Sequence, residues 1–277
     1  MISALQWHLD VGVDEALGDE PRRAGIPETA FAVKNESDLP APAPLMRVAA
    51  PIAEPAALAG AATLRAEAIK RAAAAQTLDE LREAITSFDG LDIKRTANNT
   101  VFCDGNPRAP VMVVGEAPGG DEDRIGRPFV GVSGQLLDRI LKCIGLDRMA
   151  GDPVQAIYIS NILNWRPPGN RTPSPAEVEV SLPFIERHIA LVKPKLLIFA
   201  GGVSAKALLG TEEGVSRLRG KWHVYTPRTE GISPRAEPIP ALATYHPSYL
   251  LRTPTQKKAV WQDMLILQDK RREIGLL

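Results

Sequence analysis

The chain has 277 residues, 44% of them hydrophobic, with 33 Lys and Arg against 33 Asp and Glu. That length accommodates one folded domain of ordinary size plus an extension. Only two cysteines are present, Cys103 and Cys143, which excludes a disulfide framework and a four-cysteine metal site. No apolar run approaches the roughly 18 residues of a membrane span, and a basic-then-apolar signal pattern is missing, so we expect a cytoplasmic protein without membrane association.

The charges are unevenly distributed along the chain. Residues 1–87 carry 8 Lys and Arg against 13 Asp and Glu, whereas residues 88–277 carry 25 against 20. A basic C-terminal part fits a polyanionic partner, and it equally fits an ordinary solvated surface. The charge alone therefore does not choose a partner.

The N-terminal part is rich in Ala and Pro and poor in large apolar residues. Such a composition cannot bury enough surface to offset the entropy of ordering, so we predict a disordered extension over residues 1–62. Residues 1–17 fit an inert tail best, and a short helix near residues 4–9 is the alternative, as a candidate docking peptide for a protein partner. Residues 63–87 predict a helical segment that packs on the core, and residues 88–277 predict the main domain.

Apolar strands alternate with helical patterns through the main domain. The predicted strands are 110–114, 156–160, 195–200, 221–226 and 239–244, and the predicted helices are 133–144, 175–192, 203–209 and 255–270. This alternation is typical of an α/β protein. We predict three layers, α/β/α, around a mostly parallel sheet of four to five strands.

Two of these helices carry local signals. Ser174 and Glu177 flank a proline at the first helical position, which predicts a capping box at the start of one helix. Residues 133–144 place their large apolar residues on one stripe. On the other face of that helix, Asp138 is expected to pair with Lys142 at i,i+4.

Two motifs rich in glycine, proline and polar residues lie far apart in the chain. GEAPG occupies 115–119, directly after a predicted strand, with GRPFVG at 126–131, and HPSYLLR occupies 246–252. Glu116 emerges at the carboxyl end of its strand, where ligands bind in open α/β sheets. We therefore expect these motifs to form two rims of one pocket.

Three further segments extend the pattern, namely FCDGNP at 102–107, YISN at 158–161 and RPPGNRTP at 166–173. Together with the two rims, they resemble the uracil-DNA glycosylases of the thermostable type, also called family four. The resemblance covers residues 88–270. It implies a monomeric enzyme that excises uracil from single- and double-stranded DNA in base excision repair, and that associates with the nucleoid.

The resemblance also implies roles for four residues around a flipped base. Phe129 would stack on uracil, and Asn161 would donate to O4 and accept from N3–H, a pattern that cytosine reverses. His246, neutral or charged, would donate to O2 as negative charge grows there. Glu116 would orient a water at C1′ of the sugar or stabilise an oxocarbenium-like centre.

The loop around Glu116 completes the predicted base pocket. Better-known glycosylases carry aspartate at the next position, where this chain has alanine, so the carboxylate role shifts to Glu116. We interpret the acidic residues at 121–123 as loop-capping or solvated groups. Glycine lets the backbone approach the base closely, so we expect the N–H groups of residues 119 and 120 to be available to it. The substrate-binding residues predicted in this loop are Gly115, Ala117, Gly119 and Gly120.

DNA contacts are also expected outside the base pocket. Leu250 is the expected wedge that fills the hole left by the flipped base, with Tyr249 as second choice, and Arg252 would pair with a phosphate. The amino terminus of the helix over 133–144 suits another phosphate. The DNA-binding residues predicted in this way are Ser133, Gly134, Arg171, Ser248, Tyr249, Leu250 and Arg252.

The chain departs from the family at the positions of its [4Fe-4S] cluster. Alignment on the motifs places the four cluster cysteines at Phe88, Leu91, Trp165 and Ser181, and three of these residues have no ligand atom. We therefore expect no cluster, no metal and no other cofactor. A related branch that traps uracil covalently inserts a basic loop ending in histidine, which residues 162–171 lack, so turnover is predicted.

Two alternative functions remain open. One is a catalytically weak relative that binds damaged DNA and recruits partners through its N-terminal extension. The presence together of Glu116, Phe129, Asn161 and His246 favours an enzyme over such a binder. The other is a glycosylase of wider scope that also removes deaminated purines, which the sequence leaves open.

Overall fold

The computed structural model describes residues 55–232 and 237–277. The predicted helical segment forms α2 (Pro55–Ala74) and α3 (Leu78–Thr86). α2 begins at Pro55, so it overlaps the end of the predicted extension. Alanine has the highest helix propensity of all residues, so a stretch with few large apolar groups still forms a helix. The rest of the predicted extension, including the docking peptide, lies outside the described residues.

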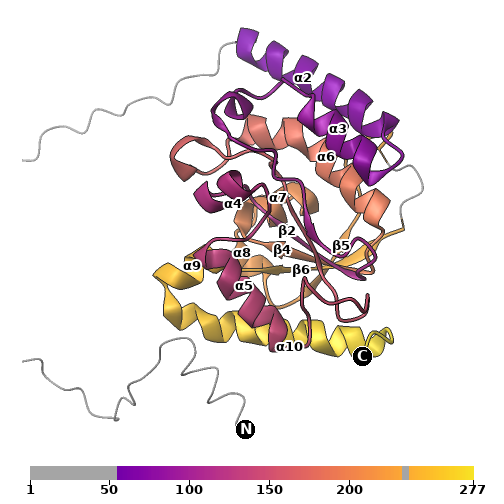
Figure 1. The fold of residues 1–277 in the computed structure, drawn as a ribbon, viewed down its shortest axis with the longest axis vertical. Coiled ribbons are helices and arrows are strands. Elements are labelled where there is room, and N and C mark those ends of the chain that lie inside the picture. The colour runs from indigo at the N-terminus through magenta and orange to yellow at the C-terminus, as the bar shows by residue number, and fades with distance from the viewer. Residues whose placement is uncertain (1–54, 233–236) are drawn as a thin grey trace, which may run out of the picture. The chain divides into compact units, whose positions relative to one another are not determined.

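A mostly parallel sheet lies at the centre of the folded part (Figure 1). Its inner four strands are parallel, and a short antiparallel strand is added at each edge. The order across the sheet is β1 (Asp104–Gly105), β3 (Tyr158–Asn161), β2 (Val111–Gly115), β4 (Leu196–Ala200), β6 (Ile239–Thr244) and β5 (Trp222–Tyr225).

The predicted α/β/α architecture is confirmed. Within the described residues the sheet has six strands, not four or five, because β1 is only two residues long and too short to give a hydrophobic pattern. Alternate side chains of β2 divide between two cores: Met112 and Val114 face one, and Val111 and Val113 face the other. This is the period-2 geometry of a strand buried on both faces.

The two cores are covered by different helices. On one side of the sheet lie α2, α3, α6 (Pro175–Val192) and α7 (Gly202–Leu209), and on the other lie α5 (Val132–Lys142) and α10 (Lys257–Glu273) (Figure 1). α6 begins and ends where predicted. Its capping box is present, since Ser174 Oγ accepts from the N–H of Glu177 at 3.3 Å and Glu177 Oε2 accepts from the N–H of Ser174 at 2.8 Å.

The predicted apolar stripe of α5 is buried, but the predicted ion pair on its other face is wrong. Asp138 binds Arg148 instead, with 2.8 Å between Nε and Oδ1, and Lys142 Nζ lies 3.3 Å from Asp147 Oδ2. Arg148 and Asp147 follow the helix in a loop. A buried guanidinium that fixes several acceptors competes better for a carboxylate than a flexible i,i+4 lysine does.

Short helices follow the carboxyl ends of three inner strands. They are α4 (Gly120–Ile125) after β2, α7 after β4 and α9 (Pro247–Arg252) after β6, and α8 (Val215–Leu218) precedes β5. Single 3₁₀ turns occur at η2 (Asp92–Thr96), η3 (Pro168–Asn170) and η4 (Pro254–Gln256). This carboxyl edge carries the loops that form the site.

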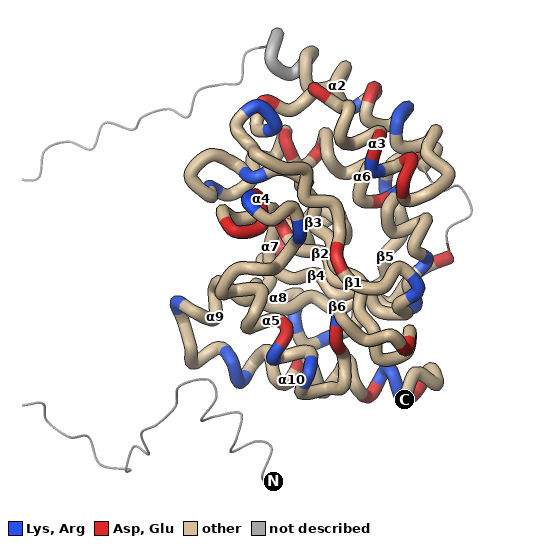
Figure 2. Tube along the Cα trace, in the orientation of Figure 1, with Lys and Arg blue, Asp and Glu red and all other residues tan. Residues whose placement is uncertain are grey.

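The charged residues do not separate onto two faces. Figure 2 shows Lys and Arg at the end of α9 and along α10, while α4 carries acidic positions with one basic position. Because α9 follows β6, its basic end lies at the same edge of the sheet as the site. Among the described residues, no helix combines the length and hydrophobicity needed to cross a lipid bilayer.

Candidate active site

A pocket of about 400 Å³ opens at the carboxyl edge of the sheet. Its walls come from the loop after β2, the end of β3, the segment around residues 167–173 and the start of α9. The two motifs expected to form opposite rims therefore meet in one cavity. The predicted residues that line it are Glu116, Ala117, Gly119, Phe129, Ser133, Asn161, Arg171, His246, Ser248 and Arg252.

Asn161 carries the most unusual side chain in this pocket. It is the last residue of β3 and is only 2% exposed, yet both its Oδ1 and its Nδ2 are buried without a hydrogen-bond partner. Buried polar atoms are nearly always paired, because leaving one unpaired costs about 1–3 kcal/mol. A donor and an acceptor held ready in a cavity are therefore suited to a ligand that supplies the complementary pair.

Gly115 lies beneath Asn161 and Phe129 and does not line the cavity directly. A Cβ at this position would lie 2.3 Å from Asn161 Oδ1 and 2.5 Å from the Phe129 ring. The glycine is therefore required for these two side chains to approach the backbone of β2. Its role in substrate binding is indirect.

Phe129 presents its ring to the pocket from an unusual backbone conformation. Its φ is 53°, in the left-handed region that residues other than glycine rarely adopt, and the residue is 4% exposed. The ring stacks on the imidazole of His246, with 5.4 Å between centroids and 29° between planes. The pocket thus has an aromatic wall beside its amide edge.

His246 is held in a defined tautomer. Its Nδ1 accepts from the backbone N–H of Ser248 at 3.2 Å and lies 2.8 Å from Ser248 Oγ. Burial lowers the pKa of His246 from 6.5 to about 4, although the Glu122 charge opposes that shift. An Nδ1 that accepts leaves the proton of the neutral ring on Nε2, so His246 is a neutral donor.

Glu116 is anchored to the start of α7. Its Oε1 accepts from the N–H of Val203 at 3.1 Å, and a Cβ on Gly201, whose φ is 116°, would lie 2.3 Å from the same oxygen. Burial raises the pKa of the Glu116 carboxyl, while the N–H groups of Val203 and Gly202 and the charge of Arg252 act in the opposite direction. Gly201 is a site residue that the sequence analysis missed.

Glu122 holds the loops of the pocket together. Its Oε2 accepts from the N–H of Gly119 at 3.0 Å, and its Oε1 accepts from the N–H groups of Val130 and Gly131 at 2.9 Å each. The loop-capping interpretation of this acidic segment is therefore correct for Glu122. Because the N–H of Gly119 is already engaged by a carboxylate, its expected contact with a base is not prepared in this structure.

Three other residues predicted to contact DNA have defined surroundings. Gly134 is buried, and a Cβ there would lie 1.9 Å from the carbonyl oxygen of Phe129, so packing explains the glycine at this position. Arg171 lines the pocket and forms a bidentate ion pair with Glu177, at 2.8 and 2.6 Å. Ser133 lines the pocket from the first turn of α5.

Leu250, the expected wedge, is buried. It is 0% exposed and belongs to the core beneath α5 and α10, so its side chain does not face the surface in this structure. Its neighbour Leu251 is 44% exposed on the same short helix. Tyr249 packs against Tyr245, with ring centroids 5.0 Å apart, in a second cleft next to the pocket, and Arg252 borders both.

The residues at the cluster positions do not fit a [4Fe-4S] group. Phe88, Leu91 and Trp165 offer no thiolate or other ligand atom, and all are at most 6% exposed in one core. The Phe88 ring packs edge-on against Phe184, with centroids 5.3 Å apart. Ser181, the fourth position, has a buried hydroxyl without a partner. Among the described residues, no cluster of three or more His, Cys, Asp or Glu is arranged to hold a metal ion.

Fold and pocket together define a site for a flat heterocycle with a hydrogen-bonding edge. The family model described as the uracil DNA glycosylase superfamily matches residues 102–265. The chain belongs to this superfamily.

Several relatives named type-4 uracil-DNA glycosylase are similar to the chain. The relative from Pyrobaculum aerophilum is 37% identical over 191 residues, which cover 68% of this chain and 91% of the relative. The relative from Archaeoglobus fulgidus is 34% identical over 192 residues, covering 68% and 90%. The relative from Thermotoga maritima is 33% identical over 163 residues, covering 58% and 76%.

Proposed function

We propose that this chain is a monofunctional uracil-DNA glycosylase, which flips a deoxyuridine out of DNA and hydrolyses its N-glycosidic bond to leave an abasic site. The observation that carries this proposal is the buried, unpartnered amide of Asn161 in the pocket. Uracil supplies the missing partners, because O4 accepts from Nδ2 while N3–H donates to Oδ1. Membership of the superfamily and the names of the relatives support the same substrate.

Recognition in this proposal combines one face and one edge of the base. The flipped uracil lies against the Phe129 ring, which holds any flat base, and presents its edge to Asn161. Cytosine would face the amide with its donor and acceptor reversed, and buried groups left unpaired reject such an analogue strongly. Selectivity therefore resides in Asn161, and affinity in Phe129.

His246 stabilises the leaving group. As the bond between C1′ and N1 breaks, its electron pair moves onto uracil and charge accumulates on O2. The neutral Nε2–H of His246 is the donor for that oxygen, and the backbone N–H of Ser248 holds the ring in place from the other side. A preorganised donor of this kind contributes about 3–4 kcal/mol to transition-state stabilisation.

Glu116 acts on the sugar side. Its Oε1 is held by the start of α7, so the carboxylate keeps a fixed position at the border between the pocket and the neighbouring cleft. There it orients a water toward C1′ and accepts a proton as the hydroxyl adds to the sugar, while the uracil anion takes up a proton from solvent. The raised pKa of Glu116 favours proton acceptance.

We propose that the reaction needs no cofactor and releases its product. Apolar side chains fill three of the four cluster positions, and water is the only co-substrate. The purified protein should lack the absorbance shoulder around 400 nm that iron–sulfur clusters give, and it should contain no stoichiometric iron. Stoichiometric iron with that shoulder would contradict this part of the proposal.

The test of the main proposal is a glycosylase assay on oligonucleotides. Labelled single and double strands with one uracil are incubated with the protein, and abasic sites are then cleaved with alkali. Strand cleavage is expected at the uracil, and Glu116→Gln and His246→Ala should each lower the rate by orders of magnitude. No cleavage by the wild-type chain would refute the proposal and favour a damage-binding protein.

A wider base scope is a second candidate that the same observation favours. Hypoxanthine places a carbonyl beside an N–H, as uracil does, so it offers Asn161 the same acceptor and donor. Oligonucleotides with hypoxanthine or xanthine belong in the same assay. Cleavage at hypoxanthine that is lost in Asn161→Ala would assign the wider scope to the same pocket, and cleavage at uracil alone would rule it out.

A further inference from the structure

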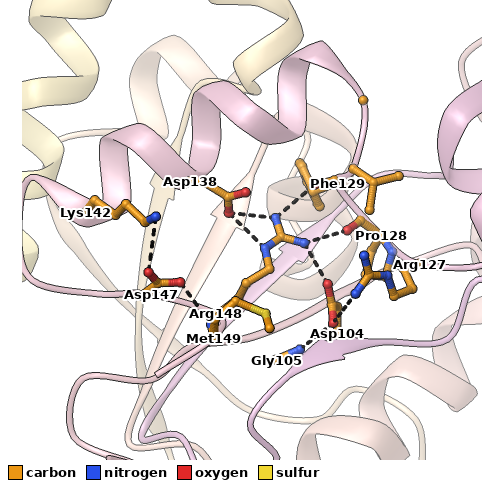
Figure 3. A network of polar contacts seen from close by, with 12 residues as sticks. Asp104, Gly105, Arg127, Pro128, Phe129, Asp138, Lys142, Asp147, Arg148 and Met149 are labelled. Carbon is orange, nitrogen blue, oxygen red and sulfur yellow. Dashed lines mark hydrogen bonds and ion pairs between the residues drawn. The ribbon is translucent and has the colours of Figure 1, made fainter. Parts of the chain in front are cut away.

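Arg148 lies outside the pocket but binds the backbone that carries its aromatic wall (Figure 3). The residue follows α5 in the loop beside the bridge between Asp147 and Ala156, and its side chain is 8% exposed. Its Nη1 donates to the carbonyl of Pro128 and its Nη2 to the carbonyl of Phe129, both at 2.9 Å. One planar guanidinium thus holds two consecutive carbonyls.

Two carboxylates fix the guanidinium in turn. Asp138 on α5 accepts from Nε at 2.8 Å, and Asp104 on β1 accepts from Nη1 at 2.9 Å (Figure 3). The charge of Arg148 is therefore balanced by one carboxylate on a helix and one on an edge strand. Because two carboxylates hold the guanidinium in place, Arg148 restrains the backbone at residues 128 and 129 instead of moving with it.

The loop at Phe129 needs such a restraint. A left-handed φ of 53° on a phenylalanine costs about 1–2 kcal/mol relative to the ordinary regions, so the residue would relax if it were free. The conformation directs the carbonyl toward Arg148 and the ring toward the pocket, where it stacks on His246. On the other side of the loop, Glu122 holds the N–H groups of Val130 and Gly131.

We infer that Arg148 is a positioning residue for base excision, which holds the Phe129 ring in the orientation that a flipped base stacks on. This inference rests on the proposed glycosylase function. Arg148 touches neither the pocket nor DNA in this account, and its whole effect on the reaction passes through Phe129. Displacing a positioning element by about 1 Å can lower a rate by about 100-fold.

The test is a double-mutant cycle between the two residues. Arg148→Lys retains the charge but cannot hold two carbonyls and two carboxylates in one plane, and Phe129→Leu removes the ring. Single-turnover rates on a uracil oligonucleotide should fall by about 100-fold in Arg148→Lys. In the Phe129→Leu background, the same substitution should change the rate by less than about 3-fold, because the group that it positions has gone.

Additive effects in the cycle would overturn the inference, since they would show that Arg148 acts on the reaction by another route. Arg272→Met serves as the matched control, because Arg272 forms an exposed ion pair with Asp269 on α10, and it should leave the rate unchanged. If Arg148→Lys does not fold, Asp104→Ala removes, among the contacts of Arg148, only the hydrogen bond from Nη1 to this carboxylate and should lower the rate by about 5-fold, again only when Phe129 is present.

Hydrogen exchange separates this inference from the proposed function. Amides of residues 129–131 should exchange at least 10-fold faster in Arg148→Lys than in the wild type, with the melting temperature of the remaining core unchanged. Unchanged exchange in this segment would overturn the positioning role even in a protein that proved inactive. Absence of uracil excision by the wild type, with faster exchange in the variant, would instead refute the glycosylase proposal and leave the positioning role intact.

Discussion

Removing the Asn161 side chain should separate activity from stability. Both polar atoms of this amide are buried without partners in the free protein. Neither atom bonds to another residue, so Asn161→Ala breaks no hydrogen bond within the fold and leaves no other group of the protein unpaired. The substitution loses few apolar contacts, because alanine retains the Cβ. We therefore expect the free energy of unfolding to stay the same or to rise by up to about 2 kcal/mol.

The same substitution should nearly abolish uracil excision. Loss of two buried hydrogen bonds to the base should lower kcat/KM by about 1,000-fold, which corresponds to about 4 kcal/mol of transition-state binding. Unfolding in urea and single-turnover excision on one protein preparation measure the two effects. Destabilisation by more than about 2 kcal/mol together with near-normal excision would refute the reasoning, because it would make Asn161 a structural residue.

Asn164 provides the matched control. It is also a buried asparagine, 5% exposed and three residues away, but its Nδ2 donates to the carbonyl of Val101 at 3.0 Å. Asn164→Ala leaves that carbonyl unpaired and should lower the free energy of unfolding by about 1–3 kcal/mol. Excision under conditions where the variant is folded should change far less than in Asn161→Ala.

Three further predictions follow from the site. The pKa of His246 is about 4 in the folded protein and near 6.5 in the unfolded chain, so the free energy of unfolding should fall by up to about 3 kcal/mol as the pH decreases from 6.5 to 4. Because His246 stays neutral above about pH 4, the rate of excision by the wild type should show no titration near pH 6.5. A loss of rate near pH 6.5 that disappears in His246→Gln would contradict this. Gly201→Ala should displace the Glu116 carboxylate and reduce excision at least 10-fold in a folded protein; unchanged excision would remove Glu116 from the mechanism. Leu251→Ala should slow excision from duplexes more than from single strands, and Leu250→Ala should destabilise the fold by about 2–5 kcal/mol; the reverse pattern would restore Leu250 as the wedge.

Local patterns were sufficient for most of the fold. Apolar runs of strand length alternated with helical stripes, and such patterns depend only on neighbours a few residues apart. α6 shows this clearly, because its capping serine and its first-turn proline specify its start. The start of α2 was harder to place from sequence, because the composition before residue 63 suggested disorder while alanine propensity favours a helix.

The pocket could be assembled from the motifs because parallel strands end at one edge of a sheet. Glu116 and Asn161 directly follow or end strands β2 and β3, and His246 follows β6, so topology alone brings these side chains together. Their residue types already indicated a polar edge beside an aromatic wall. The sequence therefore predicted which of these side chains line one pocket.

Pairings and orientations depended on tertiary packing. On the six-residue helix α9, Leu250 is buried while its neighbour Leu251 is exposed. A helix this short has no hydrophobic periodicity from which to predict which of the two is buried. Asp138 takes its partner from a loop ten residues away, and the Glu116 carboxylate is held by the N–H of Val203, 87 residues further along the chain. Helices and strands are specified by local sequence, whereas the contacts that orient the side chains of the pocket arise largely when segments distant in the sequence pack together.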